Sequence, residues 1–118
     1  MTGVGTDIIE ISKIKSYSEK EDFVFKTFTP KEIEYSLKKD SGKRQAEHLA
    51  TAFAGKEAVF KALGIEYFEP QEIEILRDET GKPSARLSGK TKELVGDKKI
   101  EISLSFTNDN AIGFAVVN

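Results

Sequence analysis

The chain has 118 residues, of which 38% are hydrophobic and 32% are charged, and its formal net charge is −2. This length and composition predict one globular domain over residues 1–118, and the charge gives no reason to expect binding of nucleic acid or an anionic membrane. There is no cysteine and one histidine, His48, which excludes thiolate sites and leaves little material for a histidine-based zinc site or a Ser-His-Asp triad. No stretch reaches the roughly 18 apolar residues of a membrane span, and the N-terminus lacks a signal-peptide pattern, so we expect a cytoplasmic protein.

The first third of the chain predicts a short strand followed by helices. The strand is expected over 1–9, and Asp7 is unusual within it because strands disfavour aspartate. A strand-end aspartate that caps the next helix is the alternative. Residues 10–28 show helical spacing, which the polar run 18–22 divides into two pieces. The sequence TPKE then matches a capping box with proline at the first helical position, so a further helix is expected over 30–38.

The stretch 43–64 is predicted to form one long helix that ends with Gly64 as a left-handed C-cap. One side carries large apolar residues, and alanines recur at i+4 on another, which allows a neighbouring backbone to come close. Lys56 falls within the large apolar stripe, and Glu57 and Lys61 lie along its border. Such charges are rarely buried without partners, so another protein charge, a metal or an anionic ligand must balance them. The alternative is an ordinary amphipathic helix with an i,i+4 ion pair on its wet edge.

The second half of the chain predicts mostly strands. Alternating residues indicate a half-buried strand at 72–76, and the turn sequence DETGKP leads to a returning strand at 85–87. A short helix is expected over 88–94. Two more strands are expected at 101–106 and 111–117, on either side of the turn sequence NDN. A strand, then helices, then mostly strands is typical of the α+β class.

Asp7 and Glu57 stand out among the acids because each lies in an otherwise apolar element. Two carboxylates suit Mg²⁺, which proteins usually hold with one or two carboxylates while waters and substrate phosphates complete its shell. The basic residues that can balance phosphate charge are Lys43, Arg44, Lys56 and Lys61. The chain has no Walker motif and no GxGxxG, so the residues alone also leave open a generic phosphate-binding module.

Two motifs resemble those of one known family. GVGTDI at 3–8 resembles the motif G-x-G-x-D followed by an aliphatic residue, and FAGKEAVFKALG at 53–64 resembles F-A-x-K-E-A-x-x-K-A-x-G. Both belong to the 4′-phosphopantetheinyl transferases, and the short chain is similar to their holo-[acyl-carrier-protein] synthase branch. Weaker similarity at 73–75, 81–83 and 103–105 extends the resemblance over nearly the whole chain. It implies that family's α+β fold, in which a small antiparallel sheet packs against a long central helix and shorter helices.

The resemblance implies transfer of the 4′-phosphopantetheine arm from coenzyme A to a serine of an apo acyl carrier protein, with Mg²⁺ as cofactor and adenosine 3′,5′-bisphosphate as the released product. By position, Asp7 and Glu57 match the family's Mg²⁺ ligands, and Lys61 matches the lysine that contacts the pyrophosphate. These three are the expected catalytic residues, and either Glu57 or a metal-bound water would deprotonate the serine. Lys43 and Arg44 match basic residues near the nucleotide. The resemblance also implies a homotrimer, with coenzyme A between subunits, that serves fatty acid biosynthesis.

The chain departs from the family pattern at three places. Phe106 stands where the family usually has a histidine, and Ala52 stands where it usually has a basic residue. We therefore expect Phe106 beside the nucleotide, with the charge for the 3′-phosphate supplied by Lys43, Arg44 and Lys56. The first helical region docks an acidic carrier protein in the family, but here it contains the acidic residues Glu19, Glu21 and Asp22. The alternative function is a relative with weakened catalysis that serves as a coenzyme A- or carrier-binding subunit.

Overall fold

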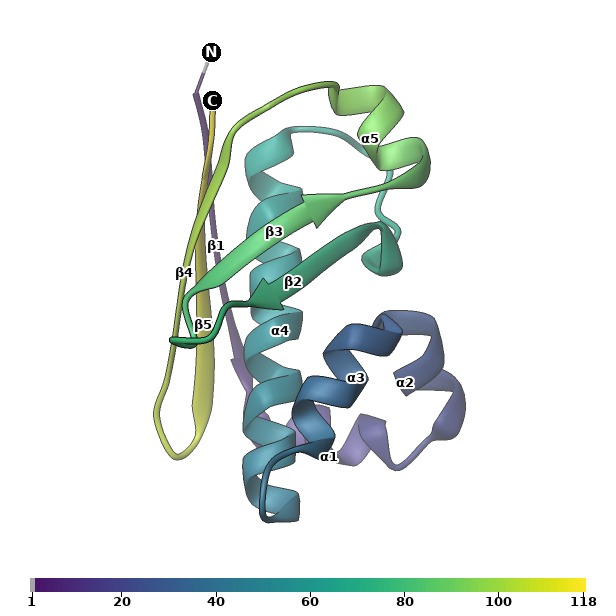
Figure 1. Ribbon diagram of the computed structural model, residues 1–118, viewed down its shortest axis with the longest axis vertical. Coiled ribbons are helices and arrows are strands. Elements are labelled where there is room, and N and C mark those ends of the chain that lie inside the picture. Colours follow the sequence, from purple (N-terminus) through teal and green to yellow (C-terminus); the bar gives the residue numbers. More distant parts are fainter. Residues whose placement is uncertain (1) are drawn as a thin grey trace.

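Helix α4 (Gly42–Leu63) runs through the middle of the molecule, and the other elements are arranged around it (Figure 1). The computed structural model describes residues 2–118, apart from the side chain of Glu21. Met1, where the sequence pattern begins the first strand, lies outside the described residues.

The elements on either side of α4 follow the predicted order. They are β1 (Gly3–Glu10), α1 (Ile11–Ser18), α2 (Glu21–Thr27), α3 (Pro30–Leu37), the 3₁₀ turn η1 (Pro70–Glu72), β2 (Ile73–Arg77), β3 (Pro83–Leu87), α5 (Gly89–Val95), β4 (Ile100–Phe106) and β5 (Asn110–Val117). The predicted helices and strands are present with ends close to those expected, and η1 is an addition. The predicted α+β class and family fold are confirmed.

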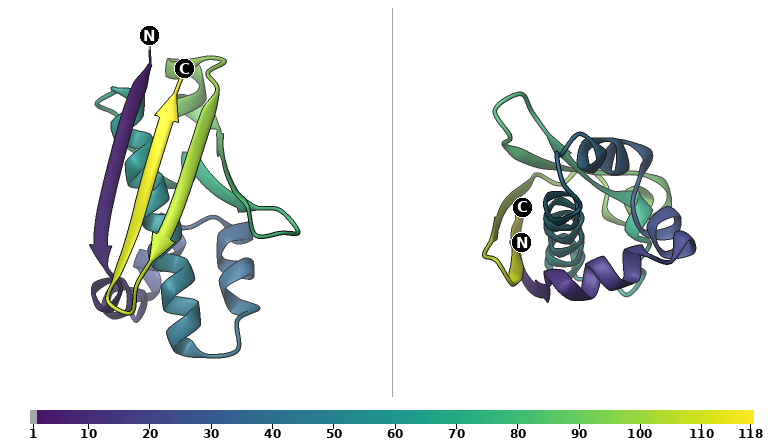
Figure 2. Two further views of the ribbon diagram at one scale, coloured as in Figure 1. Left: turned by 90° about the vertical axis from the view of Figure 1, so that its left-hand side faces the viewer. Right: turned by 90° about the horizontal axis from the view of Figure 1, so that it is seen from below.

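The strands form two antiparallel sheets, where the sequence suggested a single small one. The larger sheet has the order β1-β5-β4, so the first and last strands of the chain are neighbours. Helix α4 lies against one face of this sheet, and no helix of residues 2–118 covers the other face (Figure 2). Strands β2 and β3 pair with each other in a second sheet, and their hairpin crosses α4 obliquely (Figure 1), with β3 next to β4.

The alanine face of α4 packs directly against the backbone of the larger sheet. Ala54 and Ala58 are fully buried. A Cβ atom built on Gly5 would overlap the carbonyl oxygen of Ala58, and one built on Gly113 would overlap that of Ala54. These glycines therefore permit the close approach that the alanine spacing predicts. Asp7 lies two residues beyond Gly5, on the same face of β1, so the packing also brings Asp7 to α4.

The predicted helix ends are confirmed by their hydrogen bonds and dihedral angles. Thr29 and Glu32 form the capping box of α3: the Thr29 hydroxyl accepts from the Glu32 backbone N–H at 3.3 Å, and a Glu32 carboxylate oxygen accepts from the Thr29 N–H at 2.8 Å. Gly64 ends α4 with φ at 68°, which is left-handed. Among residues 2–118, no helix combines the length and apolar character needed to cross a membrane.

Candidate active site

Asp7 and Glu57 lie beside each other where β1 packs against α4, and Lys61 follows one helical turn after Glu57. The Asp7 side chain is 16% exposed, and its Oδ1 atom lies 3.3 Å from Nζ of Lys61. The same ammonium donates to the backbone carbonyl oxygen of Thr6 at 3.0 Å. The three residues expected to carry catalysis therefore come together from two elements that are far apart in the sequence.

Glu57 is the electrostatically perturbed member of this group. Burial raises its pKa above the usual value, the negative charge of Asp7 raises it further, and Lys61 opposes both effects. Two carboxylates held this close repel each other, so a cation between them would favour the ionised form of both. Among the described side chains, the ion pair made by these two acids is that of Asp7 with Lys61, and Glu57 has no cation within ion-pair distance.

This donor set fits a hard divalent cation. Both acids present carboxylate oxygens, which are the ligands that Mg²⁺ prefers. Among the side chains that the structure describes, no cluster of three or more His, Cys, Asp or Glu is placed to hold a metal ion. Two carboxylates therefore fit a Mg²⁺ site whose remaining ligands are waters and the phosphate oxygens of a bound substrate.

A hollow of about 380 Å³ opens beside the two acids. Its walls include Lys13 of α1, Phe53 of α4 and Asn110 of β5. Lys13 brings a second cation to the rim, and sequence reasoning did not connect it with the site. Its position after the junction of β1 and α1 gives no periodic signal that links it to Glu57, so only the fold places it there.

Lys56 has a structural role that corrects its predicted one. Its side chain is 0% exposed, and its Nζ atom lies 2.7 Å from Oε1 of Glu32. It also donates to the backbone carbonyl oxygens of Pro70 and Ile73 at 2.7 and 2.8 Å. All three donors of the ammonium therefore have protein acceptors. Of the three ways to balance Lys56 that the sequence left open, the structure uses another protein charge, so the ammonium is not available to the 3′-phosphate of coenzyme A.

The other residues expected near the nucleotide lie away from Asp7 and Glu57 in the same chain. Lys43 and Arg44 are exposed in the first turn of α4, and Nε of Arg44 lies 3.8 Å from Oδ1 of Asp40. Arg44 and Glu57 are separated by about 20 Å along the axis of α4 and by about 140° around it. Phe106 ends β4 and is 48% exposed. Within one chain, the basic pair, Lys43 with Arg44, therefore lies far from the acidic pair, Asp7 with Glu57.

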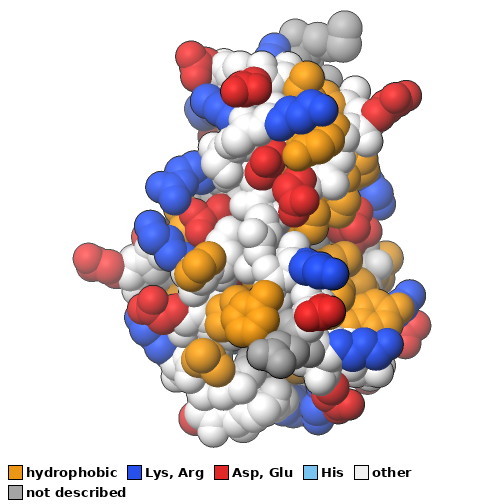
Figure 3. All heavy atoms as spheres, turned by 90° about the vertical axis from the view of Figure 1, so that its right-hand side faces the viewer, with side chains coloured by type: hydrophobic (Ala, Val, Ile, Leu, Met, Phe, Trp, Pro, Cys, Tyr) orange, Lys and Arg blue, Asp and Glu red, His pale blue; other side chains and the backbone are white. Residues whose placement is uncertain are grey.

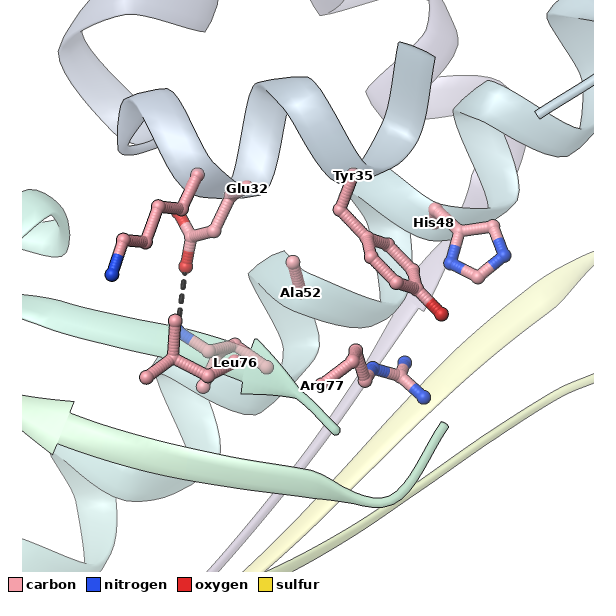
Figure 4. A pocket seen from close by; sticks show the side chains of 8 residues that line it. Glu32, Tyr35, His48, Ala52, Leu76 and Arg77 are labelled. Carbon is pink, nitrogen blue, oxygen red and sulfur yellow. Dashed lines mark hydrogen bonds between the residues drawn. The ribbon is translucent and has the colours of Figure 1, made fainter. Parts of the chain in front are cut away.

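A second pocket, of about 290 Å³, lies between α3, α4 and β2 (Figure 4). Tyr35, His48, Ala52 and Arg77 line it. Burial lowers the pKa of His48 to about 4, and nearby positive charges, Lys39 first among them, contribute to this. The sequence pattern singles out Ala52 but carries no signal for Tyr35 or Arg77. The i,i+4 spacing of His48 and Ala52 on α4 is the signal that places both on one face.

The chain is similar to known proteins over nearly its whole length. A family model described as the 4′-phosphopantetheinyl transferase superfamily matches residues 3–114. The holo-[acyl-carrier-protein] synthase of Clostridium novyi (strain NT) is 46% identical over 121 residues, which cover 98% of this chain and 86% of that protein.

Solved structures show the same likeness. The ACPS–CoA complex of Chronobacterium ammoniagenes has a TM-score of 0.85 at 26% identity, covering 99% of this chain and 96% of that one. The holo-[acyl-carrier-protein] synthase of Helicobacter pylori in complex with coenzyme A has a TM-score of 0.81 at 26% identity, covering 98% of this chain and 99% of that one.

Proposed function

The chain belongs to the 4′-phosphopantetheinyl transferase superfamily, in its holo-[acyl-carrier-protein] synthase branch, and we propose that it transfers the 4′-phosphopantetheine arm of coenzyme A to a serine of an apo acyl carrier protein. Mg²⁺ is the proposed cofactor and adenosine 3′,5′-bisphosphate the proposed second product. The observation that carries the proposal is the pairing of Asp7 with Glu57 beside Lys61 in a chain of this family. We assign the reaction to the cytoplasm and to the carriers of fatty acid biosynthesis.

In the proposed reaction, the serine oxygen bonds to the phosphorus that bears the pantetheine arm, and the P–O bond to the nucleotide phosphate breaks. The serine proton leaves to Glu57 or to a water in the hollow. Asp7 and Glu57 would hold Mg²⁺, which would supply positive charge against the pyrophosphate and polarisation of the scissile bond. The Lys61 side chain is 50% exposed, so its ammonium can contact a pyrophosphate oxygen as well as Asp7. Catalysis then consists of positioning and electrostatic stabilisation.

The separation of Arg44 from Glu57 supports a site shared between subunits. The 3′-phosphate and the 5′-pyrophosphate of coenzyme A are attached to one ribose, so they lie much closer together than the about 20 Å between these two residues along α4. One coenzyme A molecule therefore cannot contact both residues of the same chain. We propose that the acidic pair of one subunit and the basic pair, Lys43 with Arg44, of its neighbour bind the same molecule.

The uncovered face of the larger sheet supports an interface with another subunit, and the assembly that we propose is a homotrimer. Its outward side chains include large apolar residues, which are 39% to 64% exposed: Val4, Ile8, Ile112 and Phe114. No helix of residues 2–118 covers this face (Figure 2), and an apolar face of this kind usually marks an interface. Sedimentation equilibrium should give the mass of three chains, and a monomer at working concentration would contradict the assembly.

Mixed assemblies test the shared site. Glu57→Gln removes one half of the site, and Lys43→Glu with Arg44→Glu removes the other, so each variant alone should be inactive. When equal amounts are unfolded together and refolded, about one quarter of the sites should combine two intact halves. Recovery of about that fraction of wild-type activity supports the proposal, and a mixture as inactive as its components would contradict it.

The transfer itself is tested by incubating the protein with coenzyme A, Mg²⁺ and an apo acyl carrier protein. Intact mass spectrometry should show the carrier gaining one phosphopantetheine arm, and chromatography should show an equal amount of adenosine 3′,5′-bisphosphate. A carrier that binds the protein but keeps its mass would favour the alternative of a binding subunit with weakened catalysis.

A further inference from the structure

The pocket between α3, α4 and β2 contains a guanidinium that no acid balances. Arg77 donates to the carbonyl oxygen of Gly81 at 3.0 Å and to the Thr51 hydroxyl at 3.4 Å. Among the described side chains, no carboxylate forms an ion pair with it. Arginine has five N–H donors, so Arg77 keeps several for a ligand. In Figure 4 its side chain lies on the same side of the pocket as the Tyr35 ring and the His48 imidazole.

The surroundings of Arg77 are positive. Burial lowers the pKa of His48 to about 4, and the positive charges of Lys39, Arg77 and Arg44 add to this effect. The acid that lines the pocket, Glu32, is already committed, because its carboxylate bonds Lys56 at 2.7 Å and accepts the Ile75 N–H at 2.7 Å. Arg44, outside the pocket lining, already pairs with Asp40 at 3.8 Å. Among the described side chains, Arg77 is therefore left without a carboxylate partner in a pocket whose one lining acid is committed, which favours binding of an anion.

The pocket has room for a group much larger than a chloride ion or one water. Its volume of about 290 Å³ is roughly ten times the share of one water in the liquid, ~30 Å³. Ala52 lies at the back of the pocket (Figure 4), and its small side chain leaves this space open. Two aromatic side chains line one side of the pocket, Tyr35 and His48, and their ring centroids are 5.2 Å apart. They suit a ligand that carries a ring or sugar as well as charge.

We propose that this pocket binds a phosphate monoester through Arg77. This assignment rests on the proposed function, in which the phosphate monoester is the 3′-phosphate of coenzyme A. Arg77 then supplies the positive charge that neither Ala52 nor the buried Lys56 can supply. Ala52 and Glu57 lie about 140° apart around α4, so the bound coenzyme A has its pyrophosphate on a neighbouring subunit, as the shared site requires. Inorganic phosphate has the same chemistry and is the alternative source.

Binding of three ligands to the full-length protein tests this assignment: coenzyme A, 3′-dephospho-coenzyme A and inorganic phosphate. Calorimetry with Mg²⁺ should show the wild type preferring coenzyme A over the dephospho form by about 10-fold or more, as expected for a charge-assisted contact. Arg77→Gln should abolish this preference by weakening coenzyme A alone. Arg77→Lys should keep part of it. The matched control is Arg86→Gln on β3, whose guanidinium pairs with Glu74 at 2.8 Å, and it should keep the full preference.

The only histidine of the chain, His48, gives a readout that does not depend on transfer. Its ring resonances should shift on titration with inorganic phosphate in the wild type and in Arg86→Gln, but not in Arg77→Gln. Phosphate-dependent shifts without a preference for coenzyme A would support the pocket and assign it to free phosphate. A preference that survives Arg77→Gln would overturn the 3′-phosphate assignment, and no His48 shift with any ligand would overturn the pocket, whether or not the protein modifies a carrier.

Discussion

The Nζ atom of Lys56 lies 2.7 Å from Oε1 of Glu32, with the two side chains 0% and 1% exposed. Burial lowers the pKa of Lys56 and raises that of Glu32, and the attraction between them opposes both shifts. The other oxygen of Glu32 accepts the backbone N–H of Ile75 at 2.7 Å. The pair thus joins α4, α3 and β2, and it fixes the turn of α4 that also carries Glu57.

Replacing Lys56 should destabilise the fold strongly. Lys56→Met leaves the buried Glu32 charge without its counter-ion, and breaking a buried ion pair in this way typically costs about 3–5 kcal/mol. Urea unfolding followed by circular dichroism measures the loss. Adding Glu32→Gln to this variant removes the unpaired charge and should restore part of the stability. The exposed pair Lys99 and Glu101 provides the control, because Lys99→Met should change stability by less than about 1 kcal/mol. A similar small loss for Lys56→Met would contradict the structural role.

His48 should make stability depend on pH in a defined window. Burial, followed by the charges of Lys39, Arg77 and Arg44, lowers its pKa in the folded protein from 6.5 to about 4. Between these values the unfolded chain binds a proton that the folded chain does not, so the free energy of unfolding falls as pH is lowered through the window. His48→Gln removes this contribution. Unfolding curves at pH 7 and pH 4.5 should therefore show a larger loss for the wild type than for the variant, and equal losses would refute the assignment.

Lys61 should contribute to the chemical step and to coenzyme A affinity. Lys61→Gln removes the ammonium that lies 3.3 Å from Asp7 and is proposed to contact the pyrophosphate. Loss of one charge-assisted contact should reduce kcat/KM for coenzyme A by about 10- to 100-fold. Lys98→Gln, which removes an exposed lysine beyond α5, is the matched control. If both variants lose the same small amount of activity, Lys61 has no special role.

The sequence motifs predicted the acidic centre because each of its residues is marked locally. Asp7 interrupts a strand, Glu57 and Lys61 lie along the border of the apolar stripe of a helix, and all three fall within the two family motifs, so they stand out without knowledge of contacts. The capping box at Thr29 and the left-handed Gly64 were predictable for the same reason, because their hydrogen bonds and dihedral angles are set within a few residues.

The partner of Lys56 and the second pocket were not predictable in this way. Glu32 reads from the sequence as the third residue of a capping box, and it does serve in that role. Its second role, as the counter-ion of a lysine on another helix, depends on how α3 packs against α4. Arg77 likewise ends an ordinary alternating strand, and only the packing of β2 against α4 places it near His48 and Ala52.

Carrier docking should be less sensitive to salt than on a strongly basic surface. Lys13 lies on the rim of the acidic hollow, so a carrier seated on α1 would bring its serine near Glu57. The face that carries α2 shows acidic and basic side chains interspersed (Figure 3), and Glu19 and Asp22 are exposed at the junction of α1 and α2. Like charges across an interface slow association.

Charge reversal measures this effect. Glu19→Lys combined with Asp22→Arg should speed modification of an acidic apo-carrier at low salt, and the gain should shrink as salt is added. Glu93→Lys combined with Asp97→Arg provides the control, because both residues are exposed in or just after α5. An unchanged rate in the first variant would mean that Glu19 and Asp22 form a solvated turn directed away from the carrier.

The pairing of Asp7 and Glu57 around one Mg²⁺ is tested most directly by the Mg²⁺ dependence of transfer, followed by intact mass of the carrier. The wild type should require Mg²⁺, and Asp7→Asn and Glu57→Gln should each fall by about 100-fold or more at every Mg²⁺ concentration while keeping the native circular dichroism spectrum. Glu66→Gln, which removes an exposed acid just beyond α4, should follow the wild type. Near-normal transfer by either Asp7→Asn or Glu57→Gln at limiting Mg²⁺ would contradict the metal assignment.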